Sequence, residues 1–470
     1  MKNIFNVMNH VNHMNGMKRA WCQMLLASSA LLLPVAVQAA IPIVHWTQAS
    51  GARIYLVESP VIQMVDVKID FDAGARRDPA DKAGLASVTA AQATLGVLAV
   101  NSEPALDENG LGEAWADLGA SFAGGATSDR MSYSFRSLTF PDILPKVIAL
   151  AARQLGEPSF APDIWERNRQ RLVASIKEAN TQPATLANRA FAKAVYGAHP
   201  YGFDVNEASL AKINADDMKS LYARAVRACR AVVSIVGAVT RVQADAMVTE
   251  LLSRIQPLPS MSAAAGDCAP WVPVSEIAPL PKPAEERIAF DSAQAHVLMG
   301  QPGYKRDDPD FFALTVGNYI LGGGDFVSRL TNEVREKRGL SYSVYSYFSP
   351  ALHAGAFTIG LQTRPDQVNQ ALQVSREVLA KFVADGPTAS ELKAAKGFLI
   401  GGFALRIDTN AKLLDNVSNI AWNKLPLDYL DTWTKAVEKI SLADVKAAFG
   451  RKLQPGNMVT VVVGGADAVK

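Results

Sequence analysis

Apolar and polar positions along the chain follow two different periods, which mark predicted strands and predicted helices. Alternating or unbroken apolar stretches predict strands at 64–71, 120–127, 131–139 and 231–237. Apolar positions three and four residues apart predict helices at 142–155 and 162–182. Strands followed by several helices are typical of an α+β sandwich, in which helices pack on one face of an antiparallel-rich sheet.

The second part of the chain repeats this order of elements. It carries predicted strands at 296–300, 341–349, 354–362 and 458–464 and predicted helices at 326–337 and 365–385. Three pairs of matching landmarks lie 230, 226 and 227 residues apart, namely Pro79 with Pro309, Leu95 with Leu321, and Gly237 with Gly464. A nearly constant offset indicates a duplicated domain.

Seven prolines between residues 256 and 286 separate the two repeats. A segment so rich in proline disfavours helix and suits an extended linker. We therefore expect an N-terminal domain at 40–255, a linker at 256–286 and a C-terminal domain at 287–470. The composition is that of a globular chain, since 49% of the residues are hydrophobic and 20% are charged. The net charge of +2 excludes a strongly basic surface for nucleic acid.

Residues 1–39 have the features of a secretory signal peptide. Two basic residues at 18–19 precede an apolar stretch at 24–37, and Val37-Gln38-Ala39 fits a small-residue cleavage site. The stretch is shorter than the roughly 20 residues that span a bilayer, which favours cleavage over the alternative, an uncleaved anchor. We therefore expect a periplasmic protein that is not stably inserted in a membrane.

Cleavage after Ala39 would leave a chain that is close to neutral. It removes three of the 47 basic residues and none of the 45 acidic ones. Cys229 and Cys268 remain, and they could form a disulfide in an oxidising compartment. Two cysteines alone leave that pairing open.

Two segments carry a resemblance to a known family. The first runs from Phe71 to Pro79 and continues with Ala83-Gly84-Leu85-Ala86, and the second runs from Leu321-Gly322-Gly323-Gly324 through Ser346. With them the chain resembles the pitrilysin/insulinase family of zinc peptidases, in its mitochondrial-processing-peptidase-like branch, over nearly all of residues 45–465. The resemblance implies an α+β fold of two homologous α/β-sandwich domains joined by the proline-rich linker.

The zinc motif of that family is missing here. In active members, Ala-Gly-Leu-Ala leads into His-x-x-Glu-His, which places two imidazoles on one helix face and a glutamate beside the metal-bound water. The matching positions are Ser87, Ala90 and Ala91, none of which suits zinc. The family's later glutamate ligand would fall near Glu166, which alone is expected to be a solvated helix residue. We expect no metal and no cofactor in this chain, and we expect residues 83–95 to form a buried, alanine-rich helix.

The second family motif is present. It pairs an arginine with a tyrosine seven residues later, here Arg335 and Tyr342, and by resemblance these hold the substrate backbone and stabilise the developing oxyanion. A guanidinium offers a planar fork of donors, and a phenol donates a hydrogen bond without titrating at neutral pH. Each such donor typically lowers the activation free energy of the reaction by about 3 kcal/mol. The alternative for each residue alone is structural, as a cation at a helix end or a packed strand tyrosine.

The local pattern predicts how this pair is held. The helix at 326–337 should end at Gly339, which leaves Arg335 in its last turn. Strand alternation should put Tyr342 on one face of the sheet with Val344, and Tyr345 on the other face with Tyr347.

Some enzymes of this branch are heterodimers in which one subunit carries zinc and the other carries the arginine and tyrosine. The resemblance therefore implies a non-catalytic subunit that pairs with a zinc-bearing paralogue, completes its active site and binds peptide or unfolded polypeptide. Strand addition to a sheet edge would suit such substrates.

Two other functions stay open from the residues. One is a degenerate scaffold or peptide-binding protein with no role in proteolysis, against which the retained Arg335 and Tyr342 argue. The other is an independent hydrolase, which is disfavoured because no motif places a histidine or lysine beside Ser87.

Overall fold

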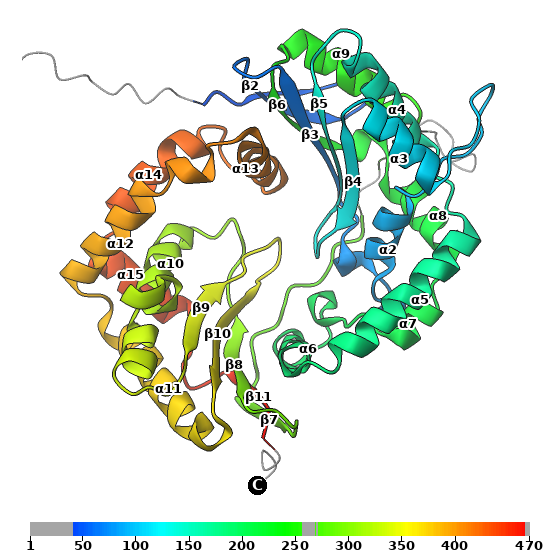
Figure 1. The fold of residues 1–470 in the computed structure, drawn as a ribbon. Helices are drawn as coiled ribbons and strands as arrows, with labels where there is room; N and C mark the ends of the chain where they lie inside the picture. The colour runs from blue at the N-terminus through cyan, green and yellow to red at the C-terminus, as the bar shows by residue number, and fades with distance from the viewer. Residues whose placement is uncertain (1–40, 256–267, 269–270, 466–470) are drawn as a thin grey trace, which may run out of the picture. The chain divides into compact units, whose positions relative to one another are not determined.

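The computed structural model describes residues 41–255, 268 and 271–465. The strands are β1 (Val44–Thr47), β2 (Arg53–Glu58), β3 (Met64–Phe71), β4 (Ser121–Ala126), β5 (Met131–Leu138), β6 (Val232–Gly237), β7 (Ala284–Ile288), β8 (Ala295–Pro302), β9 (Ser343–Phe348), β10 (Ala356–Thr363) and β11 (Val459–Val463). They form two separate sheets with helices beside them (Figure 1).

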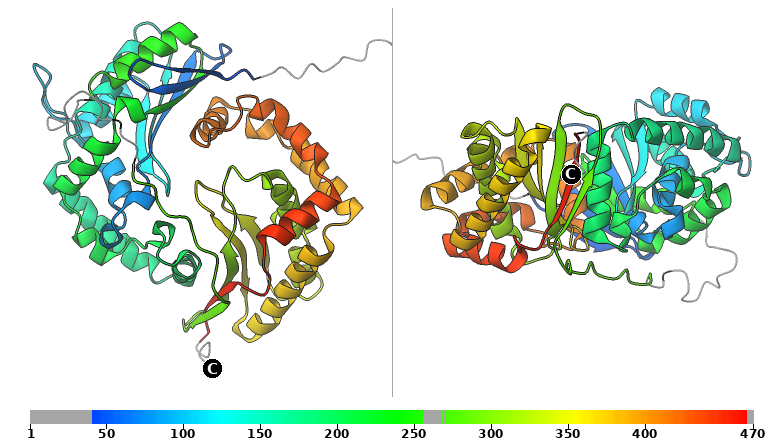
Figure 2. Two further views of the ribbon diagram at one scale, coloured as in Figure 1. Left: turned by 180° about the vertical axis from the view of Figure 1, so that it is seen from behind. Right: turned by 90° about the horizontal axis from the view of Figure 1, so that it is seen from below.

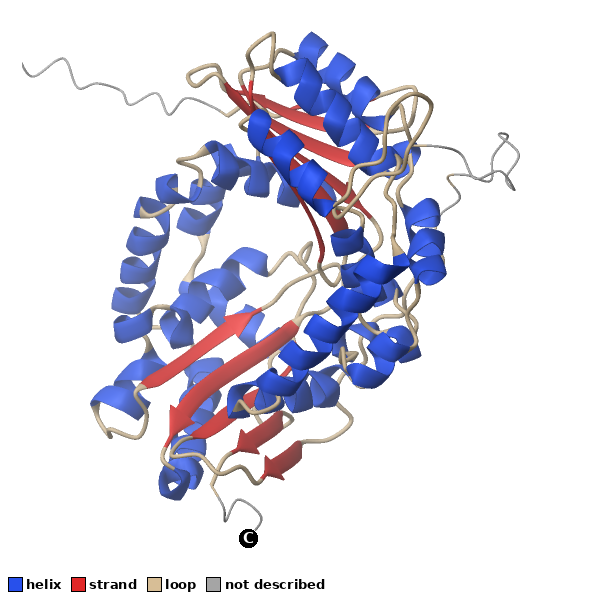
Figure 3. Ribbon diagram, turned by 45° about the vertical axis from the view of Figure 1, so that its right-hand side comes forward, coloured by secondary structure: helices blue, strands red, loops and turns tan. Residues whose placement is uncertain are grey.

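Helices occur between the strands as well as after them, and in each repeat the longest run of helices follows a strand pair, at 121–138 and at 343–363. They are α2 (Leu85–Gln92), α3 (Glu108–Asp117), α4 (Leu144–Gly156), α5 (Pro162–Ala179), α6 (Pro183–Tyr196), α7 (Glu207–Ala211), α8 (Ala215–Ala225), α9 (Arg241–Leu252), α10 (Phe311–Asn318), α11 (Val368–Asp385), α12 (Ala389–Gly401), α13 (Asn410–Trp422), α14 (Tyr429–Lys439) and α15 (Leu442–Lys452). Figure 3 shows both sheets, in red, together with these helices.

The two sheets share one strand order, which confirms the duplication. The first sheet runs β1-β2-β6-β3-β5-β4 and the second runs β7-β11-β8-β10-β9. In each, the last strand of the repeat lies between a parallel neighbour and an antiparallel one: β6 between β2 and β3, and β11 between β7 and β8. Strand β1 is an addition at the edge of the first sheet. The strand predicted at 64–71 agrees with β3 at both ends.

Each repeat contributes one helix to the sheet of the other repeat. Helix α6 packs on β8 and β11, and helix α13 packs on β6 and β3 (Figure 2). Phe191 and Val195 of α6 lie in one apolar cluster with Leu298, Val459 and Val461 of the second sheet. The expected arrangement, with helices on one face, is therefore extended by an exchanged helix on each sheet. This exchange explains why all six residues of β6 are buried.

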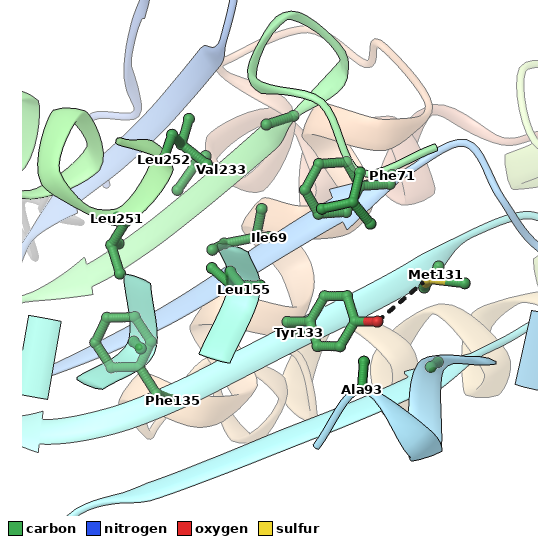
Figure 4. Close-up of a cluster of buried hydrophobic side chains, with 14 of the residues drawn as sticks. Ile69, Phe71, Ala93, Met131, Tyr133, Phe135, Leu155, Val233, Leu251 and Leu252 are labelled. Atoms are coloured by element: carbon green, nitrogen blue, oxygen red, sulfur yellow. Dashed lines mark hydrogen bonds between the residues drawn. The ribbon is translucent and has the colours of Figure 1, made fainter. Parts of the chain in front are cut away.

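The apolar core of the first repeat lies between its sheet and its own helices (Figure 4). Ile69 and Phe71 of β3 and Tyr133 of β5 are almost completely buried there. The hydroxyl of Tyr133 donates to the sulfur of Met131 at 3.3 Å, so even the polar tip of this ring has a partner. Burial of so much apolar surface is the main stabilising contribution.

A buried carboxylate joins the two repeats. Asp70 of β3 is completely buried and accepts hydrogen bonds from Ser132 at 2.5 Å, from Ser418 of α13 at 2.7 Å and from Arg130 at 3.1 Å. Arg130 also donates to the Ser418 hydroxyl at 2.8 Å. A buried charge is tolerated when its lone pairs are satisfied in this way.

The linker prediction needs one correction at its C-terminal end. Residues 284–286, assigned to the linker, belong to β7, which pairs in parallel with β11. Because β7 supplies the second sheet with its first strand, the repeat begins before residue 287. Residues 256–267 and 269–270, and the signal-peptide prediction at 1–39, lie outside the described residues.

The pairing of the cysteines, which the sequence leaves open, is present in the structure. Cys229 and Cys268 form a disulfide with a Cα–Cα separation of 6.2 Å. Close to the disulfide in sequence lies Trp271. The centroid of its ring is 4.8 Å from the guanidinium carbon of Arg77 and 4.9 Å from that of Arg230. The disulfide and this ring attach Cys268 and Trp271 to the first repeat. Among the described residues, no helix is both long and apolar enough to cross a membrane.

Candidate functional site

Helix α2 carries the positions that match the zinc motif, and a buried aspartate fixes its start. The Asp78 carboxylate accepts hydrogen bonds from the backbone N–H groups of Gly84 and Ala86, both at 2.9 Å. Burial raises the pKa of Asp78 to about 7, against the lowering effect of these backbone hydrogen bonds. The turn after β3 is thereby held to the first turn of the helix.

The side chains at the motif positions do not fit a zinc ion. Ser87 and Ala91 are exposed one turn apart on α2, whereas Ala90 is completely buried. None of them offers an imidazole or a carboxylate, the ligands that zinc takes in such sites. In the part of the chain that the structure describes, no group of three His, Cys, Asp or Glu residues lies together as metal ligands would. The rest of α2 is largely buried.

Glu166, the position nearest to the family's third zinc ligand, lies on α5 and is occupied by local contacts. It accepts a hydrogen bond from Gln170 at 3.0 Å and pairs with Arg169 at 2.7 Å. These contacts, first that with Gln170, lower the pKa of Glu166. With a side chain 47% exposed, it is a solvated helix residue.

An open sheet edge lies beside α2. Among the strands of the described residues, β4 pairs only with β5, so its other side is the edge of the first sheet. The strand also contacts α2 so closely that a Cβ at Gly124 would lie 2.8 Å from the Ala90 carbonyl oxygen. A glycine is therefore needed for this approach. An edge strand presents unpaired backbone groups that can pair with an extended peptide.

The segment before Arg335 differs from the single helix predicted at 326–337. A 3₁₀ turn, η7 (Asp325–Val327), comes first, and the chain becomes helical again only at Arg329 before the π-helical turns of η8 (Thr331–Glu336). Between the two segments, Ser328 is extended, with a φ of −79° and a ψ of 153°, which no continuing helix allows. The prediction of one continuous helix was therefore wrong at its start.

The end of that segment agrees with the prediction. Gly339 has a φ of +60°, and its N–H donates to the Arg335 carbonyl at 2.8 Å. A left-handed glycine after the last helical residue is a common helix stop. Arg335 thus lies in the final turn, and the chain reverses toward β9.

The structure brings Arg335 and Tyr342 into contact. The guanidinium carbon of Arg335 lies 4.8 Å from the centroid of the Tyr342 ring and 4.7 Å from that of Phe326. Its Nε also lies 3.4 Å from the Glu336 carboxylate. The Tyr342 side chain is 79% exposed. Neither residue of the predicted pair is packed in the core.

The predicted face of Tyr342 was wrong. Strand β9 begins at Ser343, so Tyr342 lies just before it and does not follow its alternation. Val344 is buried and Tyr342 is exposed, although the alternation would put them on one face. Tyr345 and Tyr347 do share an exposed face, with ring centroids 5.9 Å apart.

Phe326 is the residue of this site that the sequence reasoning missed. It is 67% exposed and lies against Arg335, so it belongs to the same surface as the predicted pair. No signal in the sequence points to this position, because the left-handed backbone that precedes Phe326 is adopted by Asp325, a residue other than glycine.

Comparison with known families matches both repeats. The profile described as Insulinase (Peptidase family M16) matches residues 53–207, and the profile described as Peptidase M16 inactive domain matches residues 212–399. The boundary between the two profiles falls before β6, which lies inside the first sheet. The profile boundary is thus not the boundary between the two sheets.

Two curated bacterial relatives are similar over parts of the chain. An uncharacterized zinc protease of Streptomyces coelicolor, SCO5738, is 40% identical over 141 residues, which is 30% of this chain and 30% of that protein. The protein named Non-peptidase homolog YmxG, from Helicobacter pylori, is 28% identical over 62% of this chain and 65% of its own length. The chain therefore spans less than two thirds of the length of either relative.

Solved structures are similar over nearly the whole chain. A peptidase M16 inactive domain from Pseudomonas fluorescens is 32% identical, with a TM-score of 0.82 over 90% of this chain and 97% of that one. The periplasmic protease PqqL from Escherichia coli has the same fold, with 18% identity and a TM-score of 0.75 over 90% of this chain and 45% of that one. We conclude that the chain belongs to the insulinase (M16) family of peptidases, as a homologue similar to the family's inactive members.

Proposed function

We propose that the protein is the non-catalytic subunit of a heterodimeric zinc metallopeptidase, in which Arg335 and Tyr342 bind substrate and complete the active site of a zinc-bearing paralogue. One observation carries the proposal: an exposed Arg335–Tyr342 contact exists in a chain whose α2 offers Ser87 and Ala91 in place of metal ligands. A chain that does not bind substrate would have no need for the Arg335–Tyr342 contact once the metal ligands are lost.

The contact suits the recognition of a peptide backbone. Ring contacts leave the in-plane N–H donors of a guanidinium accessible, and because Glu336 lies beside Nε at 3.4 Å, the Nη donors are the ones offered to a carbonyl oxygen. The Tyr342 hydroxyl adds a donor that remains protonated at neutral pH. Donors of this kind, aimed at a developing oxyanion, lower the barrier for hydrolysis. The zinc-bearing subunit would supply the metal and the activated water.

The proposed substrate is a peptide or an unfolded polypeptide. The free edge of β4 supports this, because only an extended chain can add to a strand edge. Ser121 and Ala123 on this strand are exposed, and the absence of side chains at Gly124 and Gly125 leaves the backbone accessible.

We place the heterodimer in the periplasm. The features of residues 1–39 support export, and the similar fold of the periplasmic protease PqqL is consistent with it. N-terminal sequencing of the protein purified from the periplasm tests this point, with Ala40 as the expected first residue. An N-terminus at Met1 or Met17 would contradict it.

The experiment mixes the purified mature chain with a zinc-bearing M16 paralogue from the same organism and follows cleavage of a quenched fluorescent peptide. We expect cleavage by the mixture, no cleavage by this chain alone, and a loss of about 100-fold or more on Arg335→Ala or Tyr342→Phe. Arg338→Ala is the matched control, because Arg338 follows the same turn and pairs with Glu333 instead. Full activity of the Arg335→Ala mixture would refute the proposal.

The alternative is a peptide-binding or scaffold protein with no role in proteolysis. The name of the Helicobacter relative, a non-peptidase homologue, favours it. It predicts that the chain alone binds an unstructured peptide, that no paralogue gains activity from it, and that Arg335→Ala changes neither result. The mixing experiment therefore separates the two functions.

A further inference from the structure

We propose that Phe326 is a positioning residue for Arg335: its exposed ring holds the guanidinium against Tyr342, with the donor edge directed toward substrate. This inference rests on the proposed function and adds a third residue to the substrate-binding pair.

The contact itself is the first support. The Arg335 guanidinium carbon is 4.7 Å from the Phe326 ring centroid, as close as it is to Tyr342 at 4.8 Å. Both distances lie within the range of an attractive cation–π interaction. A planar cation in contact with two rings keeps its in-plane Nη donors available, and among the described residues the carboxylate beside it, that of Glu336, lies 3.4 Å from Nε.

The exposure of the ring is the second support. Phe326 is 67% exposed, although a phenylalanine of a soluble protein is usually buried. Arg335 is less accessible than the ring, with 28% of its side chain exposed. The Phe326 ring therefore covers the Arg335 guanidinium and is not part of the apolar core. Contact with Arg335 accounts for the position of this ring.

The backbone that presents the ring is the third support. A Cβ at Gly322 would lie 2.5 Å from the backbone nitrogen of Ser346, so this segment passes directly against β9. Asp325 then adopts a φ of +46°, a conformation that residues with a Cβ rarely take. Such conformations persist where the surrounding structure requires them, and they gather at functional sites. Here the left-handed residue starts the turn η7, which contacts η8 and carries Phe326 to Arg335.

The functional consequence follows from the freedom of the arginine side chain. An exposed arginine side chain samples many rotamers, and it must adopt a single one when substrate binds. The two rings restrict that sampling in the free protein, so less conformational entropy is lost on binding. Loss of the Phe326 ring should therefore lower kcat/KM without removing the charge.

The test compares four variants in the mixture with the zinc-bearing paralogue. Phe326→Leu keeps apolar bulk and loses the ring, and we expect kcat/KM to fall by about 5- to 10-fold, with Phe326→Ala at least as low. Phe326→Tyr keeps the ring and should restore activity. Val327→Ala is the matched control, because Val327 is 69% exposed in the same turn and cannot stack on a cation. Circular dichroism verifies that each variant is folded.

A second measurement needs neither partner nor substrate. In the full mature chain labelled with ¹⁵N-arginine, the Arg335 Nε–H resonance, assigned with Arg335→Lys, should carry a ring-current shift that decreases in Phe326→Leu and persists in Phe326→Tyr. An unchanged resonance in Phe326→Leu, or full kcat/KM in that variant while Arg335→Ala is inactive, would overturn the role of Phe326. Full activity of Arg335→Ala would instead refute the proposed function itself.

Discussion

Arg335 and Tyr342 lie seven residues apart, and the guanidinium carbon of Arg335 lies over the Tyr342 ring, 4.8 Å from its centroid. The left-handed Gly339 between them reverses the chain and makes this contact possible. The contact is exposed and lies in the repeat opposite to the one that carries α2. The predicted pair and the positions that match the zinc motif therefore lie in different copies of one fold.

The attachment of the two repeats through Asp70 gives a prediction about stability. Asp70→Ala removes the acceptor of three hydrogen bonds and leaves Arg130 without its carboxylate. We expect a loss of about 3 kcal/mol in the free energy of unfolding, measured by urea denaturation. The control is Lys68→Ala, which breaks an ion pair between the repeats whose Asp415 is 72% exposed and should cost less than about 1 kcal/mol. Equal costs for the two variants would contradict the account.

The pair of Arg329 and Glu391 gives a prediction about pH. Hydrogen bonds, first those from Arg329, lower the pKa of Glu391 from 4.5 to about 2. Because the folded state lowers this pKa, the pair stabilises the protein above about pH 4.5, and this contribution is lost as the pH falls toward 2. Glu391→Gln should therefore reduce the free energy of unfolding by about 1–2 kcal/mol at pH 7 and by less at pH 3.

Urea denaturation of wild type and Glu391→Gln at both pH values measures that difference. Glu166→Gln is the control, since Glu166 is paired on the helix surface and its loss should change stability little at either pH. A cost of Glu391→Gln that stays constant from pH 7 to pH 3 would show that the carboxylate charge is not the stabilising feature.

The chemistry of α2 gives a prediction about metal. Ser87 and Ala91 are exposed one turn apart, so Ser87→His with Ala91→His would place two imidazoles on one helix face. We expect this double variant to bind zinc at least about tenfold more tightly than wild type, by isothermal titration calorimetry. Ser87→His alone is the control and should gain little. Zinc bound by wild type as tightly as by the double variant would disprove that the motif positions decide metal binding.

The duplicated fold could be predicted from the sequence because strand alternation and turn residues are local signals. The predicted strand at 64–71 has the bounds of β3, and the offset between Gly237 and Gly464 matches the shared strand order. The exchange of α6 and α13 could not be predicted in this way. Their apolar faces are evident, but periodicity does not tell which of two similar sheets such a face will cover.

The site was predictable as far as a motif specifies residue types. The family resemblance implied the pair of Arg335 and Tyr342, whereas the face of Tyr342 was missed because β9 starts at Ser343, two residues after the predicted start at 341. The position of Phe326 depends on the left-handed backbone at Asp325, and a residue other than glycine gives no warning of that conformation in a sequence. The edge of β4 next to α2 likewise results from tertiary packing.

The most direct test of the central claim is a titration of a fixed amount of the zinc-bearing paralogue with this chain, followed by peptide cleavage. We predict that activity rises and saturates at one chain per paralogue. Arg335→Ala should bind in the same ratio, as seen by analytical ultracentrifugation, and yield almost no activity. Activity that does not depend on the added chain, or that saturates equally with Arg335→Ala, would contradict the account.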